Sequence, residues 1–244
     1  MNFRSYGNGS DGMCMAFWNK NTNIFIDAGI QRQYRVKDIL KAHKSASGGL
    51  PDAVVCSHRH VDHLRMDFIK VLDTTYYVPE KALVGRPNAS HEVIYNDVFT
   101  VGDITITPIQ TEHHPDFKTY AFILKDGETK SVVHVEGKPK SYLEPYYNCD
   151  FMYVEANHSK TFHKYITEEL LVPNPNTNYH LTNVQAGFII GDVIRGSKKE
   201  PIIRIGNISD KRNTDVVAMN EILRATGYKP KTIKRNVYTK TLSY

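Results

Sequence analysis

Residues 52–63 read Asp-Ala-Val-Val-Cys-Ser-His-Arg-His-Val-Asp-His, a short apolar run followed directly by three histidines and an aspartate. An apolar run of this length, rich in β-branched residues, is typical of a buried strand. Alternate residues of an extended segment point the same way, so His58 and His60 can share one metal ion, while Asp62 and His63 fall to a neighbouring position. We interpret the stretch as a metal site at the end of a buried strand. The alternative is a polar loop that happens to be rich in histidine.

The segments around this stretch are predicted to be strands and helices in alternation. Apolar positions at Val36, Ile39, Leu40 and His43 have the spacing of one helix face, and Asp126 with Gly127 marks a hairpin turn. Strands are predicted at 2–6, 13–18, 23–26, 75–78, 93–98, 104–109, 119–124, 131–135, 151–155 and 202–205, and helices at 36–43, 64–72, 160–170, 181–194 and 215–226. This order indicates sheets with helices on their outer faces, in one domain over residues 1–244.

Composition adds expectations about partners and location. The chain has 244 residues, 41% of them hydrophobic, and a net charge of +5, with Lys and Arg concentrated after residue 195. That charge is compatible with a polyanionic partner, and equally with a solvated basic end. Cys14, Cys56 and Cys149 lie in or beside apolar stretches, which fits reduced core thiols. Because we find no apolar leader or membrane span, we expect a cytoplasmic protein without a membrane partner.

Five further segments extend the pattern over most of the chain. At this point the sequence resembles the metallo-β-lactamase fold superfamily, whose signature is HxHxDH after a buried strand, and within it the YycJ-like group related to RNase Z and RNase J. The segments that resemble this group, in order along the chain, are 7–14, 25–29, 154–158, 180–183 and 207–214.

The resemblance implies an α/β fold, a four-layer αββα sandwich, with two divalent metal ions, Zn or Mn. By the same resemblance His58, His60 and a histidine of the 113–114 pair hold the first ion, and the spacing to Phe122 favours His114. Asp62 and His63 hold the second ion, together with a bridging acid and a last histidine.

Two positions depart from the family pattern. The bridging aspartate falls on Glu136 and the last histidine on Asn207. Glutamate keeps a carboxylate, so bridging stays possible, whereas the neutral amide of Asn207 binds a first-row ion less firmly than imidazole. We therefore expect the second ion to be weak, exchangeable or a harder metal such as Mn or Mg. His134 is an alternative ligand, because it lies two residues from Glu136 on the same face.

Such a site supports hydrolysis by water activated on the metal. Asp62 would orient or deprotonate that water. His180 resembles the histidine that serves as the acid in RNase Z relatives, with Glu155 positioning it. The alternatives are that His180 caps a helix at the surface and that Glu155 ends its strand in solvent.

The predicted function is a metal-dependent phosphodiesterase acting on nucleic acid or on a cyclic nucleotide. Cyclic mononucleotide phosphodiesterases, including ones that phages use against nucleotide-signalled defence, occur among RNase Z relatives and form the nearest alternative. An alternative of another class is a catalytically impaired nucleotide-binding protein of the same fold. A homodimer is expected by analogy alone.

Overall fold

The computed structural model describes residues 1–9, 12–86, 91–161, 179–209, 212–233 and 241–244. The chain divides into two compact units. The first unit comprises Met1–Pro108, Leu124–Thr129 and Arg235–Tyr244, and the second comprises Ile109–Ile123 and Lys130–Lys234. Most of the helix predicted at 160–170 lies outside the described residues.

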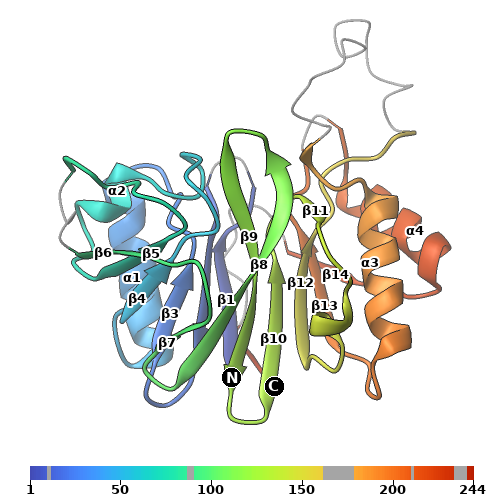
Figure 1. The fold of residues 1–244 in the computed structure, drawn as a ribbon, viewed down its shortest axis with the longest axis horizontal. Helices are drawn as coiled ribbons and strands as arrows, with labels where there is room; N and C mark the ends of the chain where they lie inside the picture. The colour runs from blue at the N-terminus through green and yellow to red at the C-terminus, as the bar shows by residue number, and fades with distance from the viewer. Residues whose placement is uncertain (10–11, 87–90, 162–178, 210–211, 234–240) are drawn as a thin grey trace, which may run out of the picture. The chain divides into compact units, whose positions relative to one another are not determined.

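The first unit is built on a seven-stranded sheet whose strands run in the order β15-β1-β2-β3-β4-β5-β6 (Figure 1). The strands are β1 (Asn2–Gly7), β2 (Cys14–Trp18), β3 (Asn23–Ile26), β4 (Ala53–Val55), β5 (Thr75–Val78), β6 (Glu92–Ile94) and β15 (Leu242–Ser243). From β3 to β6 the neighbours pair in parallel, and β4, between β3 and β5, has every residue buried. Because β3 and β4 are parallel neighbours, the residues that follow them leave the sheet at the same edge.

Helices α1 (Gln33–Ser47) and α2 (Met66–Ile69) belong to the same unit (Figure 1). The predicted face of α1 is confirmed, because its buried residues are Val36, Ile39, Leu40 and His43. These apolar residues join one buried cluster with Phe25 of β3 and Val54 of β4, so the helix packs on the sheet. The helix ends at Gly48, whose φ of 84° is a left-handed conformation that glycine adopts without strain.

His43 gives this core a measurable pH dependence. Burial, with repulsion from Arg4, lowers the pKa of His43 to about 4. Imidazole in an unfolded chain titrates near pH ~6.5, so between these values the unfolded chain binds a proton that the folded chain does not. The free energy of unfolding should therefore fall by about 3 kcal/mol as the pH drops from 6.5 to 4.

Urea unfolding followed by the fluorescence of Trp18, the one tryptophan of the chain, measures this dependence. In a His43→Gln variant the free energy of unfolding should fall less steeply over the same pH range. The variant lacks the imidazole that takes up one proton when the chain unfolds. A variant that keeps the wild-type slope would assign the pH dependence to other groups.

The second sheet has eight strands in the order β11-β8-β9-β10-β12-β13-β14, with β7 paired to β8. They are β7 (Phe99–Val101), β8 (Ile104–His114), β9 (Phe117–Asp126), β10 (Thr129–His134), β11 (Lys138–Pro139), β12 (Phe151–Glu155), β13 (Ile202–Gly206) and β14 (Lys231–Thr232). The predicted hairpin turn at Asp126 and Gly127 lies between β9 and β10. Strands β10, β12, β13 and β14 are parallel, so the residues after β10, β12 and β13 share one edge.

Helices α3 (Asn183–Gly196) and α4 (Asp215–Thr226) pack with β12 and β13 in the second unit, which also contains the short helix η2 (Glu144–Tyr146) (Figure 1). Helix α3 begins with a capping box, in which the Thr182 side chain accepts from the Gln185 N–H and the Gln185 side chain accepts from the Thr182 N–H. This cap satisfies backbone donors that a helix start otherwise leaves open, and it fixes the chain just after His180. No helix in the described ranges is both long and apolar enough to cross a bilayer.

Candidate metal centre

The first candidate group is the histidine loop, residues 57–63, which follows β4 in the first unit. Backbone hydrogen bonds hold the loop against two neighbouring segments: the Ala28 N–H, after β3, donates to the His63 carbonyl at 2.7 Å, and the Met13 N–H, just before β2, donates to the Asp62 carbonyl at 2.7 Å. The predicted position of the histidines at the end of a buried strand is therefore confirmed.

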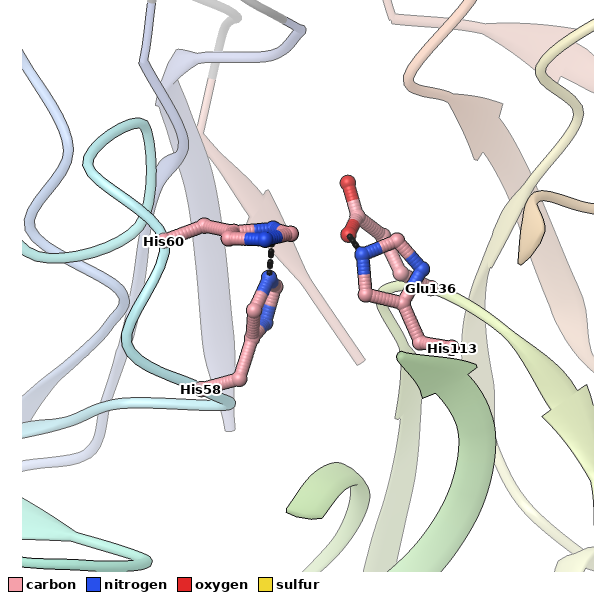
Figure 2. Close-up of side chains that lie close together, drawn as sticks. All are labelled: His58, His60, His113 and Glu136. Atoms are coloured by element: carbon pink, nitrogen blue, oxygen red, sulfur yellow. Dashed lines mark hydrogen bonds and ion pairs between the residues drawn. The ribbon is translucent and has the colours of Figure 1, made fainter. Parts of the chain in front are cut away.

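Within the loop, His58 and His60 turn their rings toward each other. His58 Nε2 lies 2.9 Å from His60 Nδ1 (Figure 2). At most one proton fits between these nitrogens, so at least one of them offers a lone pair. His58 Nδ1 lies 3.0 Å from the Ser57 hydroxyl, and it is Nε2 that faces His60. Two imidazoles that converge in this way fit a shared metal ion.

His63 is held by an aspartate whose role the sequence analysis did not identify. Asp27 is fully buried just after β3; its Oδ2 lies 2.7 Å from His63 Nδ1, and it accepts from the Ser57 N–H at 2.7 Å. Burial raises the pKa of Asp27, and His63 and Ser57 offset part of that rise. A carboxylate on Nδ1 directs Nε2 toward a metal, which is the usual support of a histidine ligand. The sequence did contain a signal for this role, because Asp27 directly follows an apolar strand in the segment 25–29, which resembles the family.

Asp62 is more exposed than its neighbour His63. Its side chain is 29% exposed, and its Oδ2 lies 3.8 Å from His63 Nε2. The predicted pairing of Asp62 with His63 at one position is thus compatible with the geometry.

The loop depends on the absence of a side chain at Gly29. A Cβ at this position would lie 1.6 Å from the Asp62 carbonyl oxygen, which is backbone that cannot rotate away. A Gly29→Ala variant should therefore lose about 3 kcal/mol or more of unfolding free energy and displace the histidine loop.

Chemical denaturation measures the loss. Gly49→Ala is the matched control, because the added Cβ would meet only the Asn23 side chain, with Nδ2 at 3.2 Å. If both variants were as stable as the wild type, the backbone packing beneath the loop would not be tight.

The second candidate group is the carboxylate cluster, which we define as His113, Glu136, Glu155, His180 and Asn207 of the second unit. Glu155 is the last residue of β12, Glu136 follows β10, and Asn207 follows β13. Because these three strands are parallel neighbours, their side chains meet at one edge of the sheet. Glu136, Glu155 and His180 each place a possible ligand atom within 4.8 Å of the others.

His113, rather than the expected His114, lies beside Glu136. His113 Nε2 is 3.0 Å from Glu136 Oε2 (Figure 2). Successive residues of β8 face opposite sides of the sheet, and the side chain of His113 is 3% exposed whereas that of His114 is 30% exposed and stacks on Phe117. His113 Nδ1 approaches the Tyr179 carbonyl at 3.3 Å, so it is again Nε2 that faces the other candidate ligand, here Glu136.

His180 and Glu155 form the contact that the sequence predicted. His180 Nδ1 lies 2.5 Å from Glu155 Oε1, and the other oxygen of Glu155 accepts from the Leu181 N–H at 3.0 Å. Glu155 is therefore buried and not exposed at a strand end, which removes the solvent alternative. The ring of His180 is fixed through Nδ1, so a proton transfer by this residue would use Nε2.

Asn207 connects the two carboxylates. Its Nδ2 donates to Glu136 Oε1 at 2.7 Å and to Glu155 Oε1 at 2.9 Å. Carboxylates accept and do not donate, so this orientation of the amide suits both partners. Only Oδ1 of Asn207 remains as a metal ligand atom, which is in keeping with a weak second ion.

His134, the alternative ligand, is committed elsewhere. Its Nδ1 lies 3.0 Å from the Tyr146 hydroxyl and its Nε2 lies 2.7 Å from the Gly137 carbonyl. Its two partners are a tyrosine hydroxyl and a backbone carbonyl, the ring is fully buried, and His134 belongs to none of the groups of described residues that could hold a metal ion.

The donor chemistry in both units fits divalent metal ions. His58, His63 and His113 each direct Nδ1 to an oxygen and turn Nε2 toward another candidate ligand. Neutral imidazole with a buried carboxylate such as Glu136 is a donor set that Zn and Mn accept.

Comparisons with known proteins agree with this chemistry. The sequence model of the family described as "Beta-lactamase superfamily domain" matches residues 22–197. No curated protein matches the chain. The structure is similar to that of the metallo-beta-lactamase fold protein YhfI from Bacillus subtilis, with 15% identity, a TM-score of 0.71, and coverage of 98% of this chain and 99% of that one.

Two other solved structures are similar over the full length. A diphosphatase from the PhnP family has 14% identity and a TM-score of 0.62, with 98% of each chain covered. Human tRNase Z, short form, has 10% identity and a TM-score of 0.60, with 100% of this chain and 99% of that chain covered. At these identities the similarity shows the fold alone, and it confirms the predicted metallo-β-lactamase fold class.

Proposed function

Because the chain belongs to the beta-lactamase superfamily, we propose that it is a metal-dependent phosphodiesterase that hydrolyses a phosphodiester of a nucleic acid or a cyclic nucleotide. The observation that carries the proposal is the common orientation of three histidines. Their Nδ1 atoms lie against oxygens, and their Nε2 atoms lie beside a second candidate ligand, which is His60 for His58, Asp62 for His63 and Glu136 for His113. A structural histidine has no need of this arrangement, as His134 illustrates.

The proposed ligands are His58, His60 and His113 for one ion, and Asp62, His63 and Glu136 for a second, weaker ion. Assigning residues of both units to the same ions follows the family resemblance, with His113 in place of His114. When bound, the ions lower the pKa of water and neutralise charge on the phosphodiester oxygens.

The chain's own groups would move the protons. Asp62, the carboxylate of the histidine loop, would accept a proton from the attacking water. His180 would donate a proton from Nε2 to the departing oxygen, because Glu155 holds Nδ1 and so fixes which nitrogen acts.

The test is a panel of substrates offered to the purified protein with Mn or Zn: single-stranded DNA, RNA, 3′,5′-cyclic nucleotides, a β-lactam and a thioester. We expect cleavage of at least one phosphodiester, loss of activity with a chelator, and recovery when metal is restored. Turnover of the β-lactam or the thioester with every phosphodiester left intact would overturn the proposal.

A second candidate is a nucleotide-binding protein without turnover, and Asn207 is the observation that favours it. An amide that already donates to Glu136 and Glu155 contributes less to a metal than the histidine of the family pattern. Nucleotide binding with no product under any metal would support this candidate against the enzyme.

A further inference from the structure

A pocket of about 650 Å³ lies in the second unit at the turn between β8 and β9. Its lining residues are Gln110, Thr111, Glu112, His113, His114, Pro115, Asp116, Phe117, Lys118, Lys138, Lys140 and Tyr179. Pockets of roughly 300–1,000 Å³ are the usual size for small-molecule ligands. Because His113 is one of the lining residues, the pocket reaches a proposed metal ligand.

The pocket offers positive charge to a ligand. Lys118, Lys138 and Lys140 line it, and within the described ranges none of the three forms an ion pair with a carboxylate. The pocket has two acidic lining residues, fewer than its three lysines: Asp116 lies 3.8 Å from His114 Nδ1, and Glu112 of β8 is the register partner of Lys138 on β11. An ammonium group that lacks a protein partner beside a pocket is suited to a phosphate.

The same pocket offers flat aromatic surface. The rings of His114 and Phe117 stack with centroids 4.4 Å apart and an interplanar angle of 7°, and the Tyr179 ring lies 5.9 Å from His114. Nucleobases stack on aromatic side chains of this kind, while lysines contact the phosphate of the same nucleotide.

We propose that this pocket binds one nucleotide of the substrate, with its phosphate on Lys138 and Lys140 and its base on the His114–Phe117 pair. The inference rests on the proposed function for the claim that the bound nucleotide is a substrate. It gives His114, which does not contact Glu136, a role in specificity.

Calorimetric titration of the metal-loaded protein with AMP, adenosine and inorganic phosphate tests the pocket without turnover of a phosphodiester. AMP should bind more tightly than either fragment. A Lys138→Met/Lys140→Met variant should weaken AMP and phosphate by about 10-fold, and His114→Ala should weaken AMP and adenosine by about 10-fold while leaving phosphate unchanged. Lys41→Met, at an exposed position on α1, is the matched control and should change nothing.

Kinetics with 3′,5′-cyclic AMP and with a short oligoadenylate identify the source of the nucleotide. A rise in KM of about 10-fold in the lysine variant for either substrate supports the pocket. Wild-type affinities for AMP in both variants, or an unchanged KM for both substrates, would overturn it. Metal-dependent hydrolysis of bis(4-nitrophenyl) phosphate, measured in parallel, reports on the proposed function separately: AMP binding with the expected variant pattern but without any hydrolysis would support the pocket and overturn the enzyme.

Discussion

Replacing His60 with alanine is expected to remove most of the bound metal and to lower kcat/KM for a phosphodiester by about 100-fold or more. His58 Nε2 and His60 Nδ1 lie 2.9 Å apart and converge on one position. Removing either ring therefore leaves one imidazole donor of this pair instead of two. Losing a residue that only supports a metal ligand already costs roughly 10- to 100-fold in affinity or activity, and a direct ligand should cost at least as much. Metal content by mass spectrometry and initial rates on the same preparation measure both effects.

His91→Ala is the matched control for this variant. It also removes an imidazole from the first unit, but its ring is 43% exposed and pairs with Asp73 at 3.1 Å. Metal content and activity should match the wild type. If His60→Ala behaved like His91→Ala, the histidine loop would not be a metal site.

The second large effect is expected from His180→Ala, which should lower kcat by about 100-fold or more and leave the metal content unchanged. His180 is held by Glu155 and is outside the proposed ligand set, so its loss removes a proton donor and not a metal. A nucleoside alkoxide needs that proton as it departs, whereas 4-nitrophenolate leaves without it. The loss should therefore be large for a nucleotide substrate and small for bis(4-nitrophenyl) phosphate.

The dependence on the leaving group separates catalysis from structural damage. Glu155→Gln should show the same dependence with a smaller loss, because the ring of His180 stays in place with a weaker partner. Equal losses for both leaving groups, or loss of metal together with activity, would contradict the role of His180 as the acid.

Local pattern predicted much of the fold. The face of α1, the buried strand β4 and the helix at Asp215–Thr226 were predicted from periodicity and breakers, because these features depend on neighbours in the sequence. The helix predicted at 64–72 is shorter, Met66–Ile69, although Leu64, Phe68, Ile69 and Leu72 are all buried as its pattern indicated. Strands β7, β11, β14 and β15 were not predicted. Each has only two or three residues, and β15 exists through its pairing with β1 at the other end of the chain, which local periodicity does not reveal.

The residues of the candidate site also divide into those that local sequence identifies and those whose role depends on the fold. Contiguous residues such as His58 and His60 carried their own signal, whereas the choice between His113 and His114 depended on which side of β8 each one faces, and spacing to Phe122 did not contain that information. The role of Asn207 depended on three strands ending side by side, so that its amide reaches Glu136 and Glu155 together. Asp27 was missed because the partner it serves, His63, is 36 positions away.

The most direct test of the central claim is the metal content of His113→Ala beside that of His114→Ala, since these adjacent residues differ in whether they contact Glu136. We expect His113→Ala to lose metal as His60→Ala does, and His114→Ala to retain the wild-type amount. Full metal content in His113→Ala, with loss in His114→Ala, would contradict the ligand set on which the proposed function rests.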